Sequence, residues 1–250
     1  MGATKGLLRS QAVRILHQDA YLIAVDKAAG VLTVPGRGRT EPSLLDLVRE
    51  IVPAALPVHR LDEGTSGLVL FAATPDAHRA LNAAFESRRA EKTYLALVRG
   101  DLPKAERIDL PLVEVRGGRV RTARPKEKGA RPAQTLVTPK ERFGAFTFCA
   151  CTPRTGRMHQ LRVHLAAIGR PLAIDPRYGE DAPVRVGDLW SGAPDPGTVV
   201  LARTPLHAAG LRIPHPRGRG WLWLESPLAD DMARCLDLLR AARRYGEEVD

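Results

Sequence analysis

The stretch HRLDEGTSGLVLFA, residues His59–Ala72, decides the fold and raises the functional question. Its second half, Leu68–Ala72, is an apolar run with the length of a buried strand. Its first half places a carboxylate, Asp62, between Leu61 and a glycine-containing turn. Acidic side chains are rarely buried unless they are paired. The position of Asp62 beside a buried strand therefore needs an explanation, either structural or chemical.

The composition around this stretch is that of a basic globular protein. The chain has 250 residues, of which 44% are hydrophobic and 26% are charged. Lys and Arg together number 38 and Asp and Glu number 28, which gives a formal net charge of +10. A positive surplus of this size attracts polyanions. Nucleic acid is the partner that the charge favours, and a basic but otherwise ordinary enzyme is the alternative.

Membrane and secretory signals are missing from the sequence pattern. No run approaches the roughly 18 apolar residues of a membrane helix, and the N-terminal stretch lacks the apolar segment of a signal peptide. The three cysteines, Cys149, Cys151 and Cys235, cannot form a disulfide framework. We therefore expect a cytoplasmic protein that does not contact a membrane. Cys149 and Cys151 alternate along an apparent strand and are interpreted as core thiols, because no further metal ligand follows at suitable spacing.

Strands and helices are predicted in mixed order along the chain. Apolar runs predict strands over residues 21–25, 31–34, 68–72, 92–98, 146–151, 206–213 and 221–225. Helical spacing predicts helices over residues 43–51, 74–85 and 158–168, and from a cap at Ser226 and Pro227 to near Gly246. Residues 176–200 are expected to form a long surface loop. Because strands and helices do not alternate strictly, we predict an α+β sheet protein, with a basic tail over residues 1–12 and one domain over residues 13–250.

Residues 113–135 differ in character from the rest of the chain. Gly117 and Gly118 indicate a hairpin turn, and seven cations but one anion, Glu127, lie between Arg116 and Arg131. A finger that grips phosphates would need such a charge. A solvated hairpin explains the same charge equally well, so the sequence leaves both interpretations open.

Arg162 is the second charged residue in an apolar setting. It lies at the border of the apolar stripe of the 158–168 helix, where an arginine either extends to solvent or is paired. Two partly buried charges of opposite sign suggest that Arg162 and Asp62 pair. A carboxylate beside an arginine stays ionised and is then suited to act as a nucleophile. A structural salt bridge is the alternative, and Asp62 could also cap its own turn through the amides of Gly64 and Thr65.

At this point the residues resemble a known family. HRLDEGTSGLVLFA is similar to the HRLD-x-x-TSG signature of the RluA family of pseudouridine synthases. Four more blocks follow the order of that family: ILHQDAYLIAVDKAAGVLTVPG (15–36), EKTYLALVRG (91–100), TGRMHQLRVHLAAIGRPLAIDPRYG (155–179) and TPLHAAGLRIPHP (204–216). Five ordered blocks are far more specific than one short motif.

The resemblance implies both a fold and a reaction. The family fold is a mixed, largely antiparallel, bent sheet with flanking helices around a central cleft. The reaction is the isomerisation of uridine to pseudouridine in structured RNA, rRNA or tRNA, and it uses neither a cofactor nor a metal. Asp62 matches the family's nucleophile, which attacks either the ribose or the base. Arg162 matches the arginine that pairs with it, and Tyr94 matches the tyrosine that stacks on the base and assists proton removal.

Substrate contacts are also implied by the resemblance. A base inside a stem must be swung out of the helix to react, and Arg60 matches the arginine that can enter the vacated stack; a phosphate contact is its alternative role. Leu206 is expected to line the uracil pocket, and His59 to fix the turn rather than to act as an acid or base. Because the chain begins close to its catalytic block, no separate N-terminal RNA-binding domain is expected. RNA binding is assigned to the catalytic domain itself, to its basic hairpin with Arg116, Arg119 and Arg121, and to the basic tail.

Two further points remain from the sequence. Glu63, Ala28 and Ile174 depart from the residues common in the family, which bears on the RNA that is selected rather than on the chemistry. We expect a monomer. Two competing interpretations stay open. One is an RNA-binding or RNA-folding protein on the same scaffold, without essential isomerase activity. The other is a different enzyme on nucleic acid, such as a metal-dependent hydrolase, which would need a carboxylate or histidine cluster that the sequence does not show.

Overall fold

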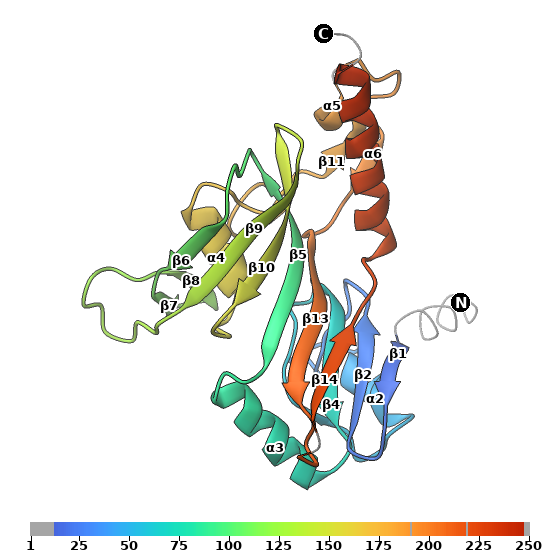
Figure 1. The fold of residues 1–250 in the computed structure, drawn as a ribbon, viewed down its shortest axis with the longest axis vertical. Coiled ribbons are helices and arrows are strands. Elements are labelled where there is room, and N and C mark those ends of the chain that lie inside the picture. The colour runs from blue at the N-terminus through green and yellow to red at the C-terminus, as the bar shows by residue number, and fades with distance from the viewer. Residues whose placement is uncertain (1–12, 191, 219, 248–250) are drawn as a thin grey trace. The chain divides into compact units, whose positions relative to one another are not determined.

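The computed structural model describes residues 13–190, 192–218 and 220–247 (Figure 1). The chain forms two compact units. Unit 1 contains the chain up to Thr93 and residues 207–227, and unit 2 contains residues 94–206 and the chain from Leu228 onward. Strand β5 (Glu91–Arg99) leads the chain into unit 2, and strand β13 (Leu206–Pro214) leads it back. The predicted basic tail, residues 1–12, lies outside the described residues.

Unit 1 is built on a mixed sheet. Its strands are β1 (Val13–Gln18), β2 (Leu22–Lys27), β3 (Leu56–Pro57), β4 (Ser66–Ala72), β13 and β14 (Trp221–Glu225). The order is β1-β2-β4-β13, with β14 paired to β13 and β3 paired to β4. The β4–β13 pair is parallel and the other pairs are antiparallel. Every residue of β4 is buried, as the apolar run in the sequence predicts.

Two helices of unit 1 begin where the sequence indicates. Helix α2 (Leu44–Arg49) is capped by Ser43, whose amide and hydroxyl exchange hydrogen bonds with Asp46. Helix α3 (Pro75–Glu86) is capped by Thr74, which accepts from the amide of Ala77. The predicted strand at residues 31–34 is wrong. The carbonyls of Leu32 and Thr33 accept the first amides of α2, so this segment covers the start of a helix instead of joining a sheet.

Unit 2 has a large antiparallel sheet, a two-stranded hairpin and several further short strands and helices. The sheet order is β5-β10-β9-β6, with β6 (Glu106–Asp109), β9 (Gln134–Arg142) and β10 (Phe146–Pro153). The predicted hairpin is present as β7 (Leu112–Val115) and β8 (Arg119–Thr122). The remaining elements are α4 (Gln160–Ala167), β11 (Val184–Arg185), α5 (Val186–Leu189), β12 (Val199–Leu201) and α6 (Asp230–Glu247).

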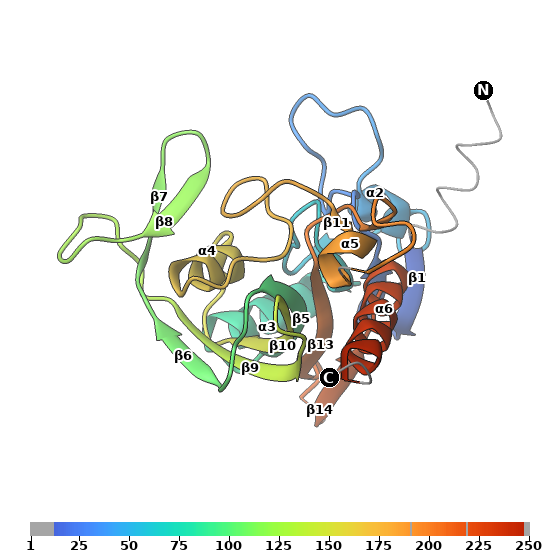
Figure 2. The ribbon, with the colours of Figure 1, turned by 90° about the horizontal axis from the view of Figure 1, so that it is seen from above.

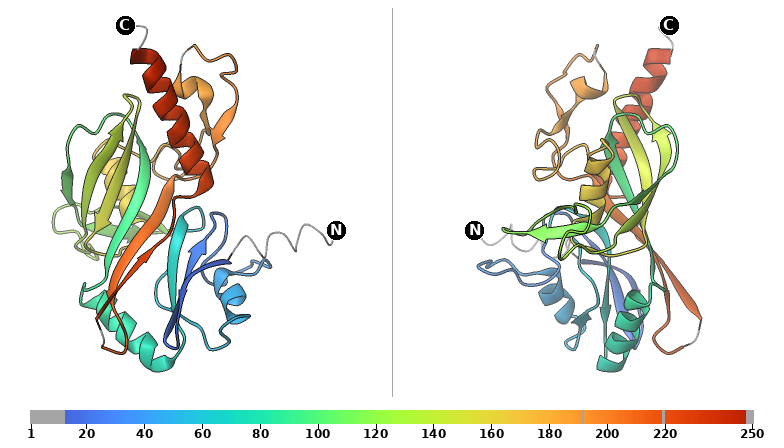
Figure 3. Two further views of the ribbon diagram at one scale, coloured as in Figure 1. Left: turned by 45° about the vertical axis from the view of Figure 1, so that its right-hand side comes forward. Right: turned by 90° about the vertical axis from the view of Figure 1, so that its left-hand side faces the viewer.

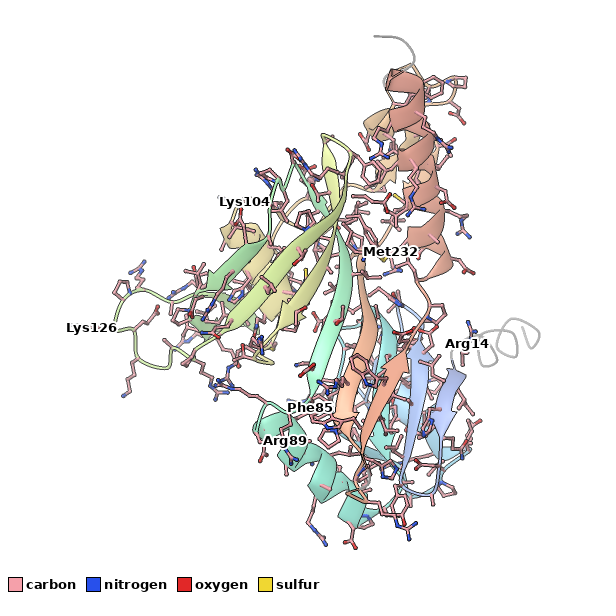
Figure 4. All side chains as sticks on the ribbon, in the orientation of Figure 1. Arg14, Phe85, Arg89, Lys104, Lys126 and Met232 are labelled. Atoms are coloured by element: carbon pink, nitrogen blue, oxygen red, sulfur yellow. The ribbon has the colours of Figure 1, made fainter. Side chains whose placement is uncertain are left out.

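The 176–200 segment is more ordered than a loop, which corrects the sequence prediction. It contains β11, α5 and the start of β12, and α6 packs against α5 and β12 (Figure 3). Val184 and Leu201 are buried in one cluster with Met232 of α6, which Figure 4 labels. These contacts join positions far apart in the sequence, so local pattern could not indicate them.

Helix α6 begins later than predicted. The expected cap, Ser226, belongs to unit 1, where its hydroxyl donates to Asp26 at 2.9 Å. The helix starts at Asp230, with Asp230 and Asp231 in the first turn, where negative charge is favourable.

Each unit has its own apolar core. In unit 1 the apolar face of α3 packs against β4, through Ala77, Leu81 and Ala84 on the helix and Leu68 and Leu70 on the strand. In unit 2 one cluster surrounds α4, with Leu161 and Leu165, and another surrounds α6. The predicted α+β class with a mixed, largely antiparallel sheet is confirmed. No described helix is both long and apolar enough to cross a membrane.

Candidate active site

The Asp62 loop in unit 1 is held by its backbone on both sides of the aspartate. On one side, the hydroxyl of Thr33 accepts from the amide of Leu61 and donates to the carbonyl of Leu61, both at 3.0 Å. On the other side, the amide of Gly30 donates to the carbonyl of Glu63 at 2.8 Å. Asp62 itself is half-buried. The flanking residues therefore fix the position from which the carboxylate emerges.

Lys27 provides a third restraint on this loop. Its side chain is fully buried, and its ammonium group donates to the carbonyls of Ala28, Val31 and Glu63 at 3.0, 2.7 and 3.1 Å. A buried cation is costly unless hydrogen bonds offset the lost hydration. The sequence analysis missed this role, because Lys27 ends a strand before a turn, where an exposed lysine is the usual expectation.

The turn after Asp62 is closed by backbone atoms. The amide of Thr65 donates to the carbonyl of Asp62 at 3.1 Å. This hydrogen bond closes the turn through a main-chain acceptor, so the turn does not depend on the carboxylate for that bond. The exposed side chain of Glu63, one of the departures from the family pattern, forms two hydrogen bonds with Arg39 at 2.8 and 3.0 Å.

Two motifs far apart in the sequence lie side by side just after this turn. Ser66 and Gly67 of β4 pair with His207 and Ala208 of β13, and the Ser66 hydroxyl is 3.0 Å from Nδ1 of His207. Gly67 has a φ of 108°, and a Cβ there would lie 2.3 Å from the carbonyl oxygen of Ala208. Glycine is therefore the residue that allows this close approach. The close contact between β4 and β13 is therefore a structural reason for the TSG and LHA motifs.

His59 fixes the chain before the turn, as the sequence analysis expects. Its Nε2 accepts from the amide of Leu70 at 3.1 Å, and its ring lies 5.2 Å from that of Phe85. Burial, and after it the positive charge of Lys92, lowers the pKa of His59 to about 3. A neutral imidazole that accepts a backbone hydrogen bond suits a structural role better than proton transfer near neutral pH.

Arg162 in unit 2 has a partner that the sequence analysis did not identify. Its Nε and Nη2 donate to the two carboxylate oxygens of Asp175 at 2.8 and 2.6 Å. Asp175 is fully buried, and Arg162 is 8% exposed. The guanidinium also lies 5.1 Å from the ring centre of Tyr178. Asp175 is therefore a partner of Arg162 in addition to any pairing with Asp62 that the sequence predicts.

Asp175 is held in the ionised form. Burial alone would raise the pKa of its carboxyl group, but the hydrogen bond from Arg162 and those from the amides of Arg177 and Tyr178 outweigh burial and lower it. An ionised carboxylate that accepts four hydrogen bonds fixes the plane of the guanidinium. The orientation of the whole Arg162 guanidinium is therefore fixed, including the edge that does not face Asp175.

The residues after Asp175 also anchor the basic hairpin to α4, which lies beside it (Figure 2). The Tyr178 hydroxyl accepts from the amide of Val120 at 3.1 Å and lies 2.7 Å from Nδ1 of His159. The Arg177 side chain donates to the carbonyl of Gly118 at 3.1 Å. The DPRYG part of the fourth block therefore connects Arg162 to the hairpin.

The three predicted hairpin cations are all exposed. Arg121 pairs with Glu127 through two hydrogen bonds of 2.8 and 2.6 Å. The hydrogen bond from Arg121 is the largest cause that lowers the pKa of Glu127, to about 2. A groove of about 200 Å³ beside the hairpin is lined by further cations, Lys128, Arg131 and Arg157. The positive charge thus extends beyond Arg116 and Arg119 into a concave surface.

The other predicted site residues are divided between the units. Arg60 is exposed in unit 1. Tyr94 is the first residue of unit 2, and it packs against the cluster that contains Leu165 of α4 and Leu206. Leu206 is 4% exposed. Unit 2 therefore brings Tyr94, Leu206 and the helix of Arg162 together around one apolar cluster.

Other titratable groups near these residues have structural partners. His164 bonds to Thr135 and to the carbonyl of Leu110, both at 2.9 Å. Cys149 and Cys151 are buried, with their sulfur atoms 3.9 Å apart, as expected for core thiols. Within residues 13–190, 192–218 and 220–247, no three His, Cys, Asp or Glu side chains form a group that could hold a metal ion.

Comparison with known proteins defines the class of this chain. The model of the RNA pseudouridylate synthase family matches residues 21–167. The chain therefore belongs to the RNA pseudouridylate synthase family, and the predicted membership is confirmed.

Two curated relatives illustrate the similarity. Ribosomal large subunit pseudouridine synthase D of Nitrosomonas europaea is 39% identical over 238 residues, which cover 91% of this chain and 65% of the relative. Ribosomal large subunit pseudouridine synthase C of Escherichia coli K12 is 34% identical over 236 residues, which cover 92% of this chain and 70% of the relative. The chain spans about two thirds of the length of these proteins.

Solved structures show the same fold. Human RNA Pseudouridylate Synthase Domain Containing 4 superposes with a TM-score of 0.76 over 96% of this chain and 98% of its own, at 24% identity. Human RNA Pseudouridylate Synthase Domain Containing 1 superposes with a TM-score of 0.64 over 92% and 95%, at 27% identity.

Proposed function

We propose that this chain isomerises uridine to pseudouridine in ribosomal RNA, with Asp62 as the nucleophile. Family membership and the names of the curated relatives support the reaction and the class of RNA. The observation that carries the assignment of Asp62 is the loop around it. Thr33, Gly30 and Lys27 fix the backbone on both sides of one half-buried carboxylate, which is the preorganisation that covalent catalysis needs.

The reaction is an internal rearrangement that needs no external reactant. Asp62 forms a covalent bond with the nucleoside, the N1–C1′ bond breaks, and the detached uracil turns. The C5–C1′ bond then forms, the bond to Asp62 breaks and restores the free carboxylate, C5 loses its proton, and N1 gains one, so substrate and product are isomers. Tyr94 stacks on the uracil and assists removal of the C5 proton, and Leu206 lines the apolar side of the pocket.

Arg162 keeps the nucleophile ionised in this proposal. Asp175 accepts from Nε and Nη2 of the guanidinium and so fixes the orientation of Arg162. A carboxylate next to a cation stays charged and is then ready to attack. Asp175 and Tyr178 act as positioning residues for Arg162.

RNA binding is assigned to cations outside the catalytic residues. Arg60 fills the space left by the everted uridine. Arg116, Arg119 and Arg121 contact phosphates, and the concave surface at Lys128 supports an RNA backbone lying there. Affinity for RNA should then fall steeply with salt concentration, because phosphate contacts release counterions.

The setting of the activity is part of the same proposal. We assign the protein to the cytoplasm, where thiols stay reduced; its three cysteines are free and buried. We propose that it acts as a monomer. We also propose that rRNA is its substrate rather than tRNA, because both curated relatives are named as synthases of the large ribosomal subunit.

The direct test compares the unaltered chain with the Asp62→Asn variant. Pseudouridine formation is followed by tritium release from rRNA that carries 5-tritiated uridine, with tRNA as a parallel substrate. We expect release from rRNA that Asp62→Asn abolishes while RNA binding is retained. Equal release by the variant would contradict the role of Asp62. Tight RNA binding without any release by the unaltered chain would favour an RNA-binding or RNA-folding protein instead.

A further inference from the structure

The outer face of the β13–β14 hairpin in unit 1 presents two tryptophans to solvent. The side chains of Trp223 and Trp221 are 70% and 45% exposed. The register places Arg212 opposite Trp223 and Pro214 opposite Trp221, so these four residues share one face of the hairpin. Strands β13 and β14 lie side by side in Figure 1. The other face is buried in the core through Leu211, Ile213 and Leu224.

Arg212 is stacked on both tryptophans. Its guanidinium carbon lies 4.3 Å from the ring centre of Trp221 and 5.1 Å from that of Trp223. Its Nη1 is 3.3 Å from Glu91, which is long for a charge-assisted hydrogen bond. Its Nε is buried, and no group in the described part of the chain accepts from it. The guanidinium is therefore held by two indole rings as well as by the carboxylate.

A groove of about 300 Å³ runs beside this stack. The residues that shape it include Glu91, Thr93, Gly210, Arg212, Trp223 and Glu225. Gly210 has no side chain, so main-chain atoms form part of the wall. The volume is at the lower end of small-molecule sites and suits a flat ring. The carboxylates of Glu91 and Glu225 supply acceptors for amino groups of such a ring.

This patch lies apart from the Asp62 loop. His207 of β13 pairs with Ser66 just after that loop, and Arg212 follows five residues later, roughly 17 Å along the strand. Nothing in the catalytic proposal uses Trp221, Trp223 or Arg212. Exposed aromatic side chains gathered on one face of a soluble protein mark interaction surfaces.

We propose that Trp221, Arg212 and Trp223 form a second RNA site that stacks unpaired nucleobases of the substrate RNA. The inference rests on the proposed function for the identity of the RNA. Exposed indoles and an arginine accept bases of any sequence, because every base has a π-face.

Charge favours RNA as the occupant over a protein segment. The chain carries a net charge of +10, which attracts nucleic acid from all directions. Arg217 is exposed in the turn that joins β13 to β14, so the hairpin carries a further cation that can contact a phosphate. A site that holds bases rather than the reacting uridine would add affinity without a sequence requirement.

The test uses an oligoadenylate of eight nucleotides, which contains no uridine and so cannot react. In a Trp190→Phe background of the full chain, the remaining fluorescence comes from Trp221 and Trp223, and stacking should quench it. Trp223→Ala should weaken binding about tenfold, the loss expected for one stacking contact. Trp223→Tyr should bind within about threefold of the parent, since tyrosine still stacks. Trp190→Phe alone should leave affinity for the oligonucleotide unchanged.

The outcomes separate this proposal from the catalytic one. Equal oligoadenylate affinity of the Trp223→Ala variant would overturn the stacking site, whatever the tritium assay shows. Self-association that Trp223→Ala abolishes, without quenching by the oligonucleotide, would overturn it in favour of a second copy of the chain. Quenching that depends on Trp223 would support the site even if no pseudouridine forms, and in that case the proposed reaction alone fails.

Discussion

Asp62 in unit 1 and Arg162 in unit 2 are positioned by opposite physical means. The Asp62 loop is held through main-chain atoms, by a buried ammonium, a hydroxyl and an amide. Arg162 is held through its own side chain, by a carboxylate and an aromatic ring. The backbone contacts fix the point from which the Asp62 side chain extends, whereas the side-chain contacts fix the position of the Arg162 guanidinium itself. Substitutions around Asp62 should therefore lower stability and turnover together, whereas substitutions around Arg162 should lower turnover more than RNA affinity.

The largest effect is expected at Lys27. The Lys27→Met change removes the donor to three carbonyl groups in a buried setting, and unsatisfied buried acceptors cost about 1–3 kcal/mol each. We expect the free energy of unfolding to fall by about 4 kcal/mol and turnover to fall with it. Urea unfolding and the tritium assay measure both quantities.

A matched control for Lys27 is Thr33→Val, which keeps the shape and removes the hydrogen bonds to Leu61. It should cost less stability, about 1–3 kcal/mol, and also reduce turnover. If Lys27→Met left both stability and turnover unchanged, backbone restraint of the Asp62 loop would not matter.

The next effect is expected at Asp175. Asp175→Asn removes the charge that orients Arg162, and misplacing a catalytic group by about 1 Å can cost about 100-fold in rate. We expect turnover to fall by about that factor while RNA affinity stays within about threefold, since Asp175 is fully buried. Single-turnover kinetics with saturating RNA separates the two.

Asp231 offers a matched control in the same unit. It binds Arg203 through two hydrogen bonds of 2.6 and 2.7 Å. Its side chain is 31% exposed whereas that of Asp175 is buried, so Asp231→Asn should cost somewhat less stability. Turnover of the folded fraction should be unchanged. Equal losses of turnover in both variants would mean that Asp175 acts only through stability.

The smallest effect is the pH dependence that His59 contributes. Its folded pKa is about 3, below the ordinary value of about 6.5, so the unfolded chain binds a proton that the native state does not. His59 therefore makes its full contribution to the free energy of unfolding above pH 6.5. This contribution is lost as the pH falls towards 3, by at most about 1.4 kcal/mol per pH unit. Urea unfolding between pH 7.5 and 4.5 should show this slope, and His59→Gln should reduce it. An unchanged slope in the variant would assign it to other groups.

The parts of the fold that local pattern encodes could be predicted from the sequence. Ser43 and Thr74 cap the helices that they precede, and the apolar run after Asp62 is a buried strand. Residues 31–34 have the composition of a strand, but their carbonyls serve α2. The order in residues 176–200 comes from packing against α6, which no local window contains.

The candidate site residues could be named from the sequence, but the residues that hold them in place could not. Asp62 and Arg162 were proposed because they are charged residues in apolar settings, and the five blocks that resemble one family added Tyr94 and the role of each residue. Asp175 was missed although it stands in a quoted block, because a partner 13 positions away follows no helical or strand spacing. Trp221 and Trp223 stand out only when the alternation of WLWLE is considered together with its pairing to β13.

We propose that Arg162 serves the chemistry at Asp62 rather than the affinity for RNA. Single-turnover kinetics and equilibrium binding of the Arg162→Met variant, on the same rRNA fragment, test it most directly. We predict that turnover per bound RNA falls by about 100-fold or more, with an RNA affinity close to that of the unaltered chain. A variant that binds RNA weakly but converts each bound RNA at the normal rate would contradict the account.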